Sequence, residues 1–158
     1  MSAKEKNLSA QTLGDSRDLS SKKIGIVVSD WNEEITGSLF EGAFDSLIRN
    51  GVQKENIFTI HVPGSFELSL GTQKMAQKKH IDAVIGLGCV IQGETRHFEF
   101  ICQSVAQGFK DVALKYDKPV IFGVLTTDTF QQALDRAGGK YGNKGDEAAI
   151  TALKMLKL

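Results

Sequence analysis

Polar residues suited to chemistry lie directly after the apolar run at residues 83–91. Glu94, Thr95 and His97 stand where apolar residues begin to recur every three or four positions, which predicts a helix over residues 95–116. The first turn of a helix has unpaired N–H groups and favours an anion such as phosphate, although a threonine there can simply cap the helix. An imidazole titrates near neutral pH, so His97 is the candidate acid or base. The alternative is a histidine that only forms a local hydrogen bond.

Two further loops offer groups for binding a ring-shaped ligand. The first contains Trp31 and Asn32, and its indole could stack on a flat heterocycle or lie partly in the core. The second, at residues 64–67, combines two backbone N–H donors, an aromatic ring and a carboxylate. Its candidate binding residues are Ser65, Phe66 and Glu67. Glu67 could instead be an acid that only stabilises the first turn of a helix.

Two cations and two thiols complete the set of candidates. Arg136 lies just before the glycine-rich segment GGKYGNKG and Lys144 lies near its end. Both suit a phosphate or a developing oxyanion, although such cations are often solvated charges at helix ends. Cys89 lies among apolar residues, which raise the pKa of a thiol and make it inert. Cys89 and Cys102 have neither C-x-x-C spacing nor clustered histidines, so we expect reduced thiols and no metal site.

Apolar runs and turn residues predict the elements that position these groups. Strands are expected at residues 23–29, 57–62, 83–88 and 120–125. A helix is expected after each strand, at residues 33–49, 65–79, 95–116 and 129–137, with a glycine-rich loop at 138–145 and a last helix after it. Strand and helix alternate four times, which is typical of an α/β domain with a parallel sheet and right-handed crossovers.

Spacing also predicts how two of the helices begin and where their loops meet. Asp30 with Glu33, and Asp128 with Gln131, are spaced as capping pairs. In parallel sheets a ligand binds outside the carboxyl ends of the strands. We therefore expect the four loops that follow the four strands to form a single site.

Composition limits the class of protein. The 158 residues are 41% hydrophobic and 24% charged with a formal net charge of zero, so no basic field is available to hold nucleic acid or an anionic membrane. No apolar run approaches the roughly 20 residues of a membrane span, and the N-terminal region lacks the apolar segment of a secretory signal. We expect a cytoplasmic protein with a flexible arm at residues 1–21 and one domain at residues 22–158.

Four segments together identify a family resemblance. VPGSFE at residues 62–67, GCVIQGETRHFEF at 88–100, IFGVLTT at 121–127 and DRAGGKYGNKG at 135–145 resemble lumazine synthases of riboflavin biosynthesis. The resemblance implies a flavodoxin-like three-layer α/β/α fold whose four parallel strands have the order 2-1-3-4. It also implies condensation of 5-amino-6-(D-ribitylamino)uracil with 3,4-dihydroxy-2-butanone 4-phosphate to give 6,7-dimethyl-8-ribityllumazine, phosphate and water, without a cofactor.

The resemblance assigns roles to individual residues. His97 matches the family's proposed proton-transfer residue. The residues that match its pyrimidine and ribityl contacts are Trp31, Asn32, Ser65, Phe66, Glu67, Cys89, Val90 and Ile91. Phe122 and Lys144 match groups that complete the pyrimidine pocket from a neighbouring subunit. Glu94, Thr95 and Arg136 match the binding site for the butanone phosphate.

The resemblance extends to assembly, and this chain departs from the family at two positions. Family members form homopentamers, many of which join into a hollow 60-subunit icosahedral cage, and the uninterrupted GGKYGNKG segment is typical of cage-forming members. An association with riboflavin synthase stays open. Gln92 replaces a basic residue that many members have, and Trp31 replaces the commoner Phe. These changes remove one cation near the phosphate and add bulk to the stacking ring.

Two other classes of function fit parts of the pattern. A flavin- or nucleotide-binding module could use the same loops and Trp31 to hold a ring, with no chemistry of its own. A structural shell protein would leave the polar residues of the loops without a role. The joint presence of His97, Arg136 and Lys144 argues against both.

Overall fold

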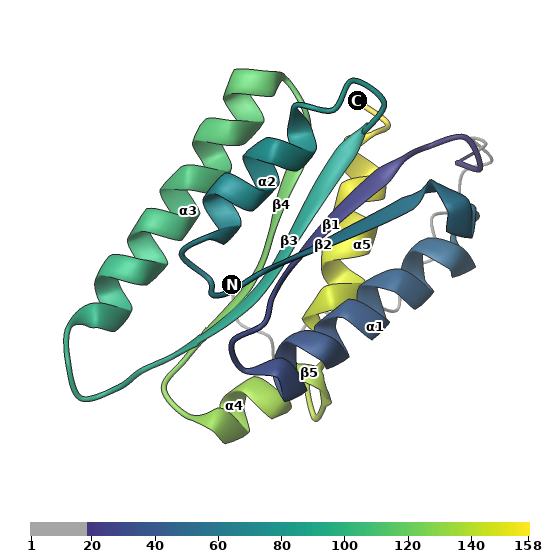
Figure 1. Ribbon diagram of the computed structural model, residues 1–158. Helices are drawn as coiled ribbons and strands as arrows, with labels where there is room; N and C mark the ends of the chain where they lie inside the picture. Colours follow the sequence, from purple (N-terminus) through teal and green to yellow (C-terminus); the bar gives the residue numbers. More distant parts are fainter. Residues whose placement is uncertain (1–18) are drawn as a thin grey trace.

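The computed structural model describes residues 19–158, which form a four-stranded parallel sheet with helices on both faces (Figure 1). The strands are β1 Ile24–Ser29, β2 Ile57–Val62, β3 Ala83–Ile91 and β4 Val120–Thr127. Their order is β2-β1-β3-β4 and every neighbouring pair is parallel. The predicted flavodoxin-like α/β fold and strand order are therefore confirmed.

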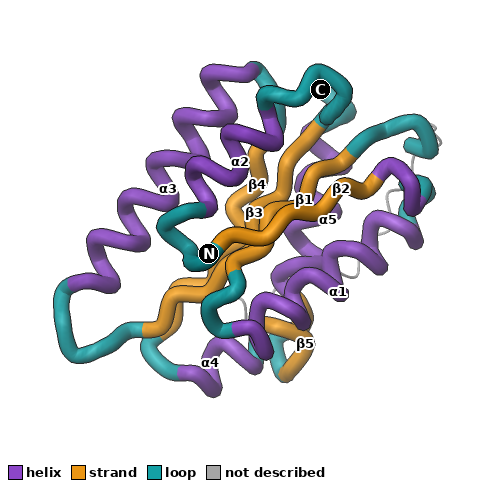
Figure 2. The backbone as a smooth tube through the Cα atoms, viewed as in Figure 1, coloured by secondary structure: helices purple, strands orange, loops and turns teal. Residues whose placement is uncertain are grey.

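The helices divide into two layers, one on each face of the sheet (Figure 2). On one face lie α1 Glu33–Arg49 and α5 Lys144–Met155, and on the other lie α2 Leu68–Ala76 and α3 His97–Tyr116. The smaller elements are the 3₁₀ turn Lys54–Asn56, the helix α4 Phe130–Leu134, and the hairpin of β5 Ala137–Gly139 and β6 Gly142–Asn143. The chain thus crosses to the first face after β1, to the second after β2 and β3, and back after β4.

The sheet is buried on both faces, which explains why its central strands are apolar runs without alternation. In β1, Ile24, Ile26 and Val28 pack into the α1 and α5 layer, whereas Val27 packs into the α2 and α3 layer. All six residues of β1 are buried. Each apolar residue in such a strand removes hydrophobic area from water whichever face it points to.

Several predicted boundaries are wrong, and the shifts affect the candidate site. β3 continues to Ile91, so Cys89–Ile91 are strand residues paired with β4 rather than a loop. The helix predicted from residue 65 begins at Leu68, and the helix predicted from residue 95 begins at His97. The glycine-rich segment contains the β5–β6 hairpin, because positive φ values at Gly138 and Gly142 allow a tight reversal.

Both predicted capping pairs are also wrong. The N-cap of α1 is Asn32 in the left-handed conformation, and no side chain caps that helix, because Asp30 instead pairs with the His61 ring. The N-cap of α4 is Thr129, whose hydroxyl accepts a hydrogen bond from the N–H of Gln132 at 3.2 Å. The favourable Thr-x-x-Gln spacing of a capping box therefore starts one residue later than Asp128.

Most of the arm expected at residues 1–21 lies outside the described residues. The described part begins at Leu19, which is buried against the first core layer, and the carbonyl of Ser20 accepts a hydrogen bond from Asn56 at 2.7 Å. In the chain from residue 19 to its end, no helix is both long and apolar enough to cross a membrane.

Candidate active site

A cleft of about 580 Å³ opens at the carboxyl ends of β1, β2 and β3. It lies where the chain leaves β1 toward one face of the sheet and β3 toward the other, the point at which parallel α/β sheets bind ligands. Nine of the predicted site residues line it, together with Gly64 and Ile101. The nine are Trp31, Asn32, Ser65, Phe66, Glu67, Cys89, Val90, Ile91 and His97. Ile101, one turn after His97 on α3, was not among the predicted site residues.

The Trp31 loop is fixed by the strands on either side of it. The N–H groups of Asp30 and Trp31 donate to the carbonyls of Val62 and Pro63, at 2.8 and 3.1 Å. Asn32 has φ 62°, and its amide Nδ2 donates to the carbonyl of Cys89 at 3.1 Å. Asparagine tolerates this left-handed conformation better than most residues. These bonds hold the loop while the indole of Trp31 remains 71% exposed at the cleft.

The loop after β2 approaches β3 closely because Gly88 has no side chain. A Cβ at Gly88 would lie 2.8 Å from Ser65 Oγ and 2.7 Å from Leu68 Cδ1, closer than real Cβ contacts. Ser65 is buried and its hydroxyl lies 3.5 Å from the carbonyl of Cys89. The Phe66 ring, by contrast, is 54% exposed at the cleft. One buried polar residue thus anchors the loop, and an exposed ring lines the cleft.

His97 is the first residue of α3 and reaches the cleft from the far side of the β3 loop. Its backbone N–H lies 3.4 Å from the hydroxyl of Thr95, which satisfies one of the free donors of the helix start. The imidazole is exposed and has no hydrogen-bond partner among residues 19–158. The ring is therefore free to exchange a proton with a ligand. Glu94 and Thr95 are exposed on the adjacent loop and do not line the cleft.

Cys89 is no nucleophile. Burial raises the pKa of its thiol to about 11, so the sulfur is protonated at neutral pH. Burial also raises the pKa of the Cys102 thiol. The shift at Cys89 agrees with the prediction that this thiol is inert. Among residues 19–158 no group of three His, Cys, Asp or Glu side chains is placed to hold a metal ion.

The remaining predicted site residues lie elsewhere on the chain. Phe122, Arg136 and Lys144 line a second cleft of about 980 Å³, formed by β4 and α5. Thr126 and Thr127, at the end of β4, line the same second cleft. The expectation of one site made from four loops is therefore wrong for a single chain. The reason is topological, because β4 is an edge strand beyond β3 and the chain returns from it to the α1 and α5 face.

Arg136 and Lys144 in the second cleft already have partners. Arg136 Nη1 donates to the carbonyl of Gln132 at 2.8 Å, and its guanidinium lies 5.0 Å from the centre of the Tyr141 ring. Lys144 Nζ lies 2.7 Å from Glu147 Oε1. An anion that binds here would have to share these cations with the partners they already have.

Comparison with known proteins identifies the family to which the chain is similar. Residues 21–158 match the family described as 6,7-dimethyl-8-ribityllumazine synthase. A protein of that name from Cytophaga hutchinsonii is 64% identical over 156 residues, which make up 99% of this chain and 98% of the relative. A protein of the same name from Parabacteroides distasonis is 53% identical over 156 residues, with the same coverage of both chains. A third, from Christiangramia forsetii, is 58% identical over 137 residues, or 86% of this chain and 82% of the relative.

Proposed function

This chain belongs to the 6,7-dimethyl-8-ribityllumazine synthase family, and we propose that it condenses 5-amino-6-(D-ribitylamino)uracil with 3,4-dihydroxy-2-butanone 4-phosphate at the cleft described above. The product is 6,7-dimethyl-8-ribityllumazine, and phosphate and water are released. The observation that carries this assignment is the convergence of an exposed indole, an exposed phenyl ring and an unpartnered imidazole at one cleft. Together they provide a surface for a flat ring and a group that can move protons beside it.

The pyrimidine occupies the region between Trp31 and Phe66. A flat heterocycle gains from stacking on an exposed aromatic face, and both rings are available. Cys89, Val90 and Ile91 at the end of β3 line the cleft beside the ring, and Glu67 accepts from ribityl hydroxyls. Nδ2 of Asn32 donates to the carbonyl of Cys89, so its Oδ1 is the atom that can accept a hydrogen bond from the ring.

Catalysis relies on positioning and proton transfer rather than a covalent enzyme intermediate. The 5-amino group of the pyrimidine attacks the ketone, and loss of water gives a C=N bond. Elimination of phosphate, ring closure and loss of a second water complete the product. Holding both substrates together can supply about 7–11 kcal/mol at best. His97 moves protons between nitrogen and oxygen atoms, which contributes about 10²–10⁴-fold.

A second copy of the chain completes the site. Phe122, Arg136 and Lys144 line the second cleft, so none of them reaches the first cleft of its own chain. If the two clefts face each other across a subunit interface, Arg136 pairs with the substrate phosphate near Glu94 and Thr95, and Lys144 with Phe122 closes the pyrimidine pocket. A bidentate guanidinium is well suited to phosphate.

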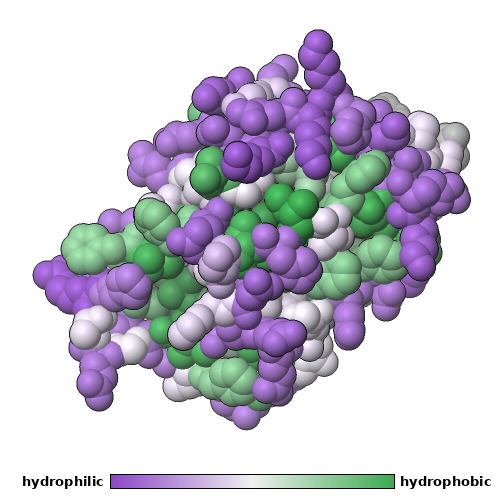
Figure 3. Space-filling model, in the orientation of Figure 1, coloured by the Kyte–Doolittle hydropathy of each residue, from purple (hydrophilic) through white to green (hydrophobic). Residues whose placement is uncertain are grey.

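Exposed apolar residues support an assembly of this kind. Large apolar side chains are exposed at Leu70 on α2, at Phe100 and Leu114 on α3, and at Phe122 on β4. Apolar atoms also gather in the middle of the face in Figure 3, with hydrophilic atoms around them. Apolar patches with a polar rim are typical of interfaces. We propose a homopentamer that assembles into a 60-subunit cage in the cytoplasm, without a cofactor, and leave an association with riboflavin synthase open.

The activity is tested by mixing the purified protein with both substrates. Lumazine absorbance and phosphate release are followed together, with the uncatalysed condensation run alongside. Equal amounts of lumazine and phosphate, formed well above the background rate, are expected. A folded protein that only matches the background rate would contradict the proposal. A yellow purified protein without catalysis would instead favour the flavin-binding module.

Assembly is tested separately by light scattering. The cage predicts the mass of sixty chains. A mass equal to five chains would contradict the cage and preserve the pentamer, and a mass of one chain would contradict both.

A further inference from the structure

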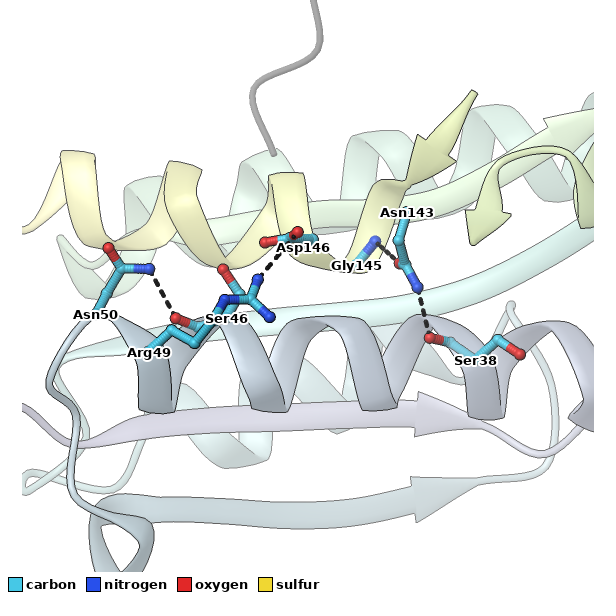
Figure 4. Close-up of polar contacts among 7 residues, drawn as sticks. All are labelled: Ser38, Ser46, Arg49, Asn50, Asn143, Gly145 and Asp146. Carbon is cyan, nitrogen blue, oxygen red and sulfur yellow. Dashed lines mark hydrogen bonds and ion pairs between the residues drawn. The ribbon is translucent and has the colours of Figure 1, made fainter. Parts of the chain in front are cut away.

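The side chain of Asn143 joins two helices at the start of α5 (Figure 4). Its Oδ1 accepts a hydrogen bond from the backbone N–H of Gly145 at 2.8 Å, which caps α5. Its Nδ2 donates to the backbone carbonyl of Ser38, in the second turn of α1, also at 2.8 Å. Both polar atoms of one half-buried amide are therefore used, one inside its own helix and one across the junction.

Two glycines allow α1 and α5 to approach each other closely and confine the Asn143 amide between the helices. A Cβ at Gly42 of α1 would overlap the Asn143 amide, and a Cβ at Gly145 would overlap the backbone of Leu39. Because a bare backbone lies on each side, the Asn143 side chain fills the gap between α1 and α5. Its position is set by contact as well as by hydrogen bonds.

Asn143 is next to Lys144 in the chain and pairs with Ala137, the residue after Arg136. Asn143 is the last residue of β6, and β6 pairs with β5, which begins directly after Arg136. The N–H of Lys144 donates to the carbonyl of Arg136 at 2.9 Å, so the backbones of the two cations are joined. A shift of Asn143 relative to α1 therefore moves the backbones of both Arg136 and Lys144.

We propose that Asn143 is a positioning residue, which fixes the Arg136–Lys144 pair against α1 so that the two cations meet substrate together. This inference rests on the proposed function of those two cations. The Asn143 amide does not itself touch substrate. It acts by holding the hairpin and the start of α5 in one place relative to the rigid first helix layer.

A second link between the same helices provides a matched control. Arg49 Nη2 at the end of α1 lies 3.2 Å from Asp146 Oδ2 in the first turn of α5 (Figure 4). This pair joins α1 to α5 but does not touch the hairpin. If Asn143 only stabilised the junction, loss of the Arg49 link would have the same kind of effect on activity.

The informative variant is Asn143→Asp. Aspartate has nearly the same shape and retains an oxygen that caps α5, but it places a second oxygen against the Ser38 carbonyl where the amide donated. Because Arg136 and Lys144 move together, we expect the KM values for the butanone phosphate and for the pyrimidine each to rise about tenfold, while kcat stays within about twofold. Arg49→Gln should lower the melting temperature and leave both substrates' KM values within about twofold. Asn143→Ser, which can still cap α5 but cannot reach Ser38, should behave like Asn143→Asp.

Arg136→Ala separates failure of this inference from failure of the proposed function. If Arg136→Ala raises the KM for the butanone phosphate while folded Asn143→Asp and Asn143→Ser leave it unchanged, the positioning role of Asn143 is overturned and the proposed function stands. If Arg49→Gln raises that KM as much as the Asn143 variants do, the role is overturned as well, because any loosening of the junction would suffice. If Arg136→Ala has no effect on KM, the proposed function of the second cleft fails and the positioning role fails with it.

Discussion

The two clefts of this chain differ in how their functional groups are held. At the first cleft, hydrogen bonds hold the backbone of the loops and leave the Trp31 indole and the His97 imidazole without polar partners among residues 19–158. At the second cleft, the charged groups themselves are paired, Arg136 with a carbonyl and Lys144 with Glu147. The first cleft is therefore prepared for a neutral ring, whereas the second can bind an anion only by sharing its cations with existing partners.

The largest expected effect is at the free imidazole of the first cleft. His97→Ala should lower kcat by about 10²–10⁴-fold, because it removes proton transfer and leaves substrate positioning in place. Single-turnover measurement of lumazine formation would give this ratio. A folded variant with no turnover above the uncatalysed rate would show that positioning alone contributes nothing. His80→Ala, outside both clefts, is the control and should be indistinguishable from the parent protein.

The next effect concerns the guanidinium of the second cleft. Arg136→Ala should raise the KM for the butanone phosphate by about 10–100-fold, since hydrogen bonds to charged groups contribute about 1.5–3 kcal/mol. The KM for the pyrimidine should stay within about twofold. Steady-state kinetics with each substrate varied in turn separates the two values. An equal rise in both would count against a specific phosphate contact. Arg96→Ala, an exposed arginine paired with Glu99, serves as the charge-matched control.

A change in stability is expected at Gly88, because its lack of a side chain lets the loop after β2 approach β3. Gly88→Ala should lower the free energy of unfolding by about 1–3 kcal/mol, because the new Cβ would be forced against Ser65 and Leu68. Denaturant unfolding would measure the loss. Gly37→Ala, where a Cβ meets nothing within 4 Å in a helix, should be neutral or slightly stabilising. A neutral Gly88→Ala would show that the loop after β2 can move away at no cost.

The smallest effect tests the pairing at the second cleft most directly. Glu147→Gln keeps an oxygen near Lys144 and removes the competing charge, so the KM for the pyrimidine should fall by about two- to fivefold. The effect is modest because the pair is partly exposed to water. Titration of KM against salt would show a smaller salt dependence in the variant. A rise in KM would mean that Glu147 orients Lys144 instead of competing for it.

Sequence patterns were sufficient to predict the sheet and most of the residues that line the first cleft. Continuous apolar runs located all four strands of the parallel sheet, and loops that follow neighbouring strands must meet. The same rule failed for β4, because the face to which the chain returns after that strand decides where Arg136 and Lys144 lie, and spacing does not encode that face. The Thr129 cap was recoverable, since Thr129 and Gln132 have capping-box spacing. The left-handed conformation of Asn32 could not be predicted, because it depends on the bond to Cys89.

The single tryptophan of the chain gives the first cleft an optical signal of its own. Trp31 is the only indole in the 158 residues, and it is largely exposed beside the cleft. Indole emission from this protein therefore arises at the first cleft, without a background from buried tryptophans elsewhere. A ring that stacks on Trp31 changes the polarity and contacts of the whole emitting population at once. Binding of the pyrimidine alone can thus be followed by intrinsic fluorescence, with no label and no turnover.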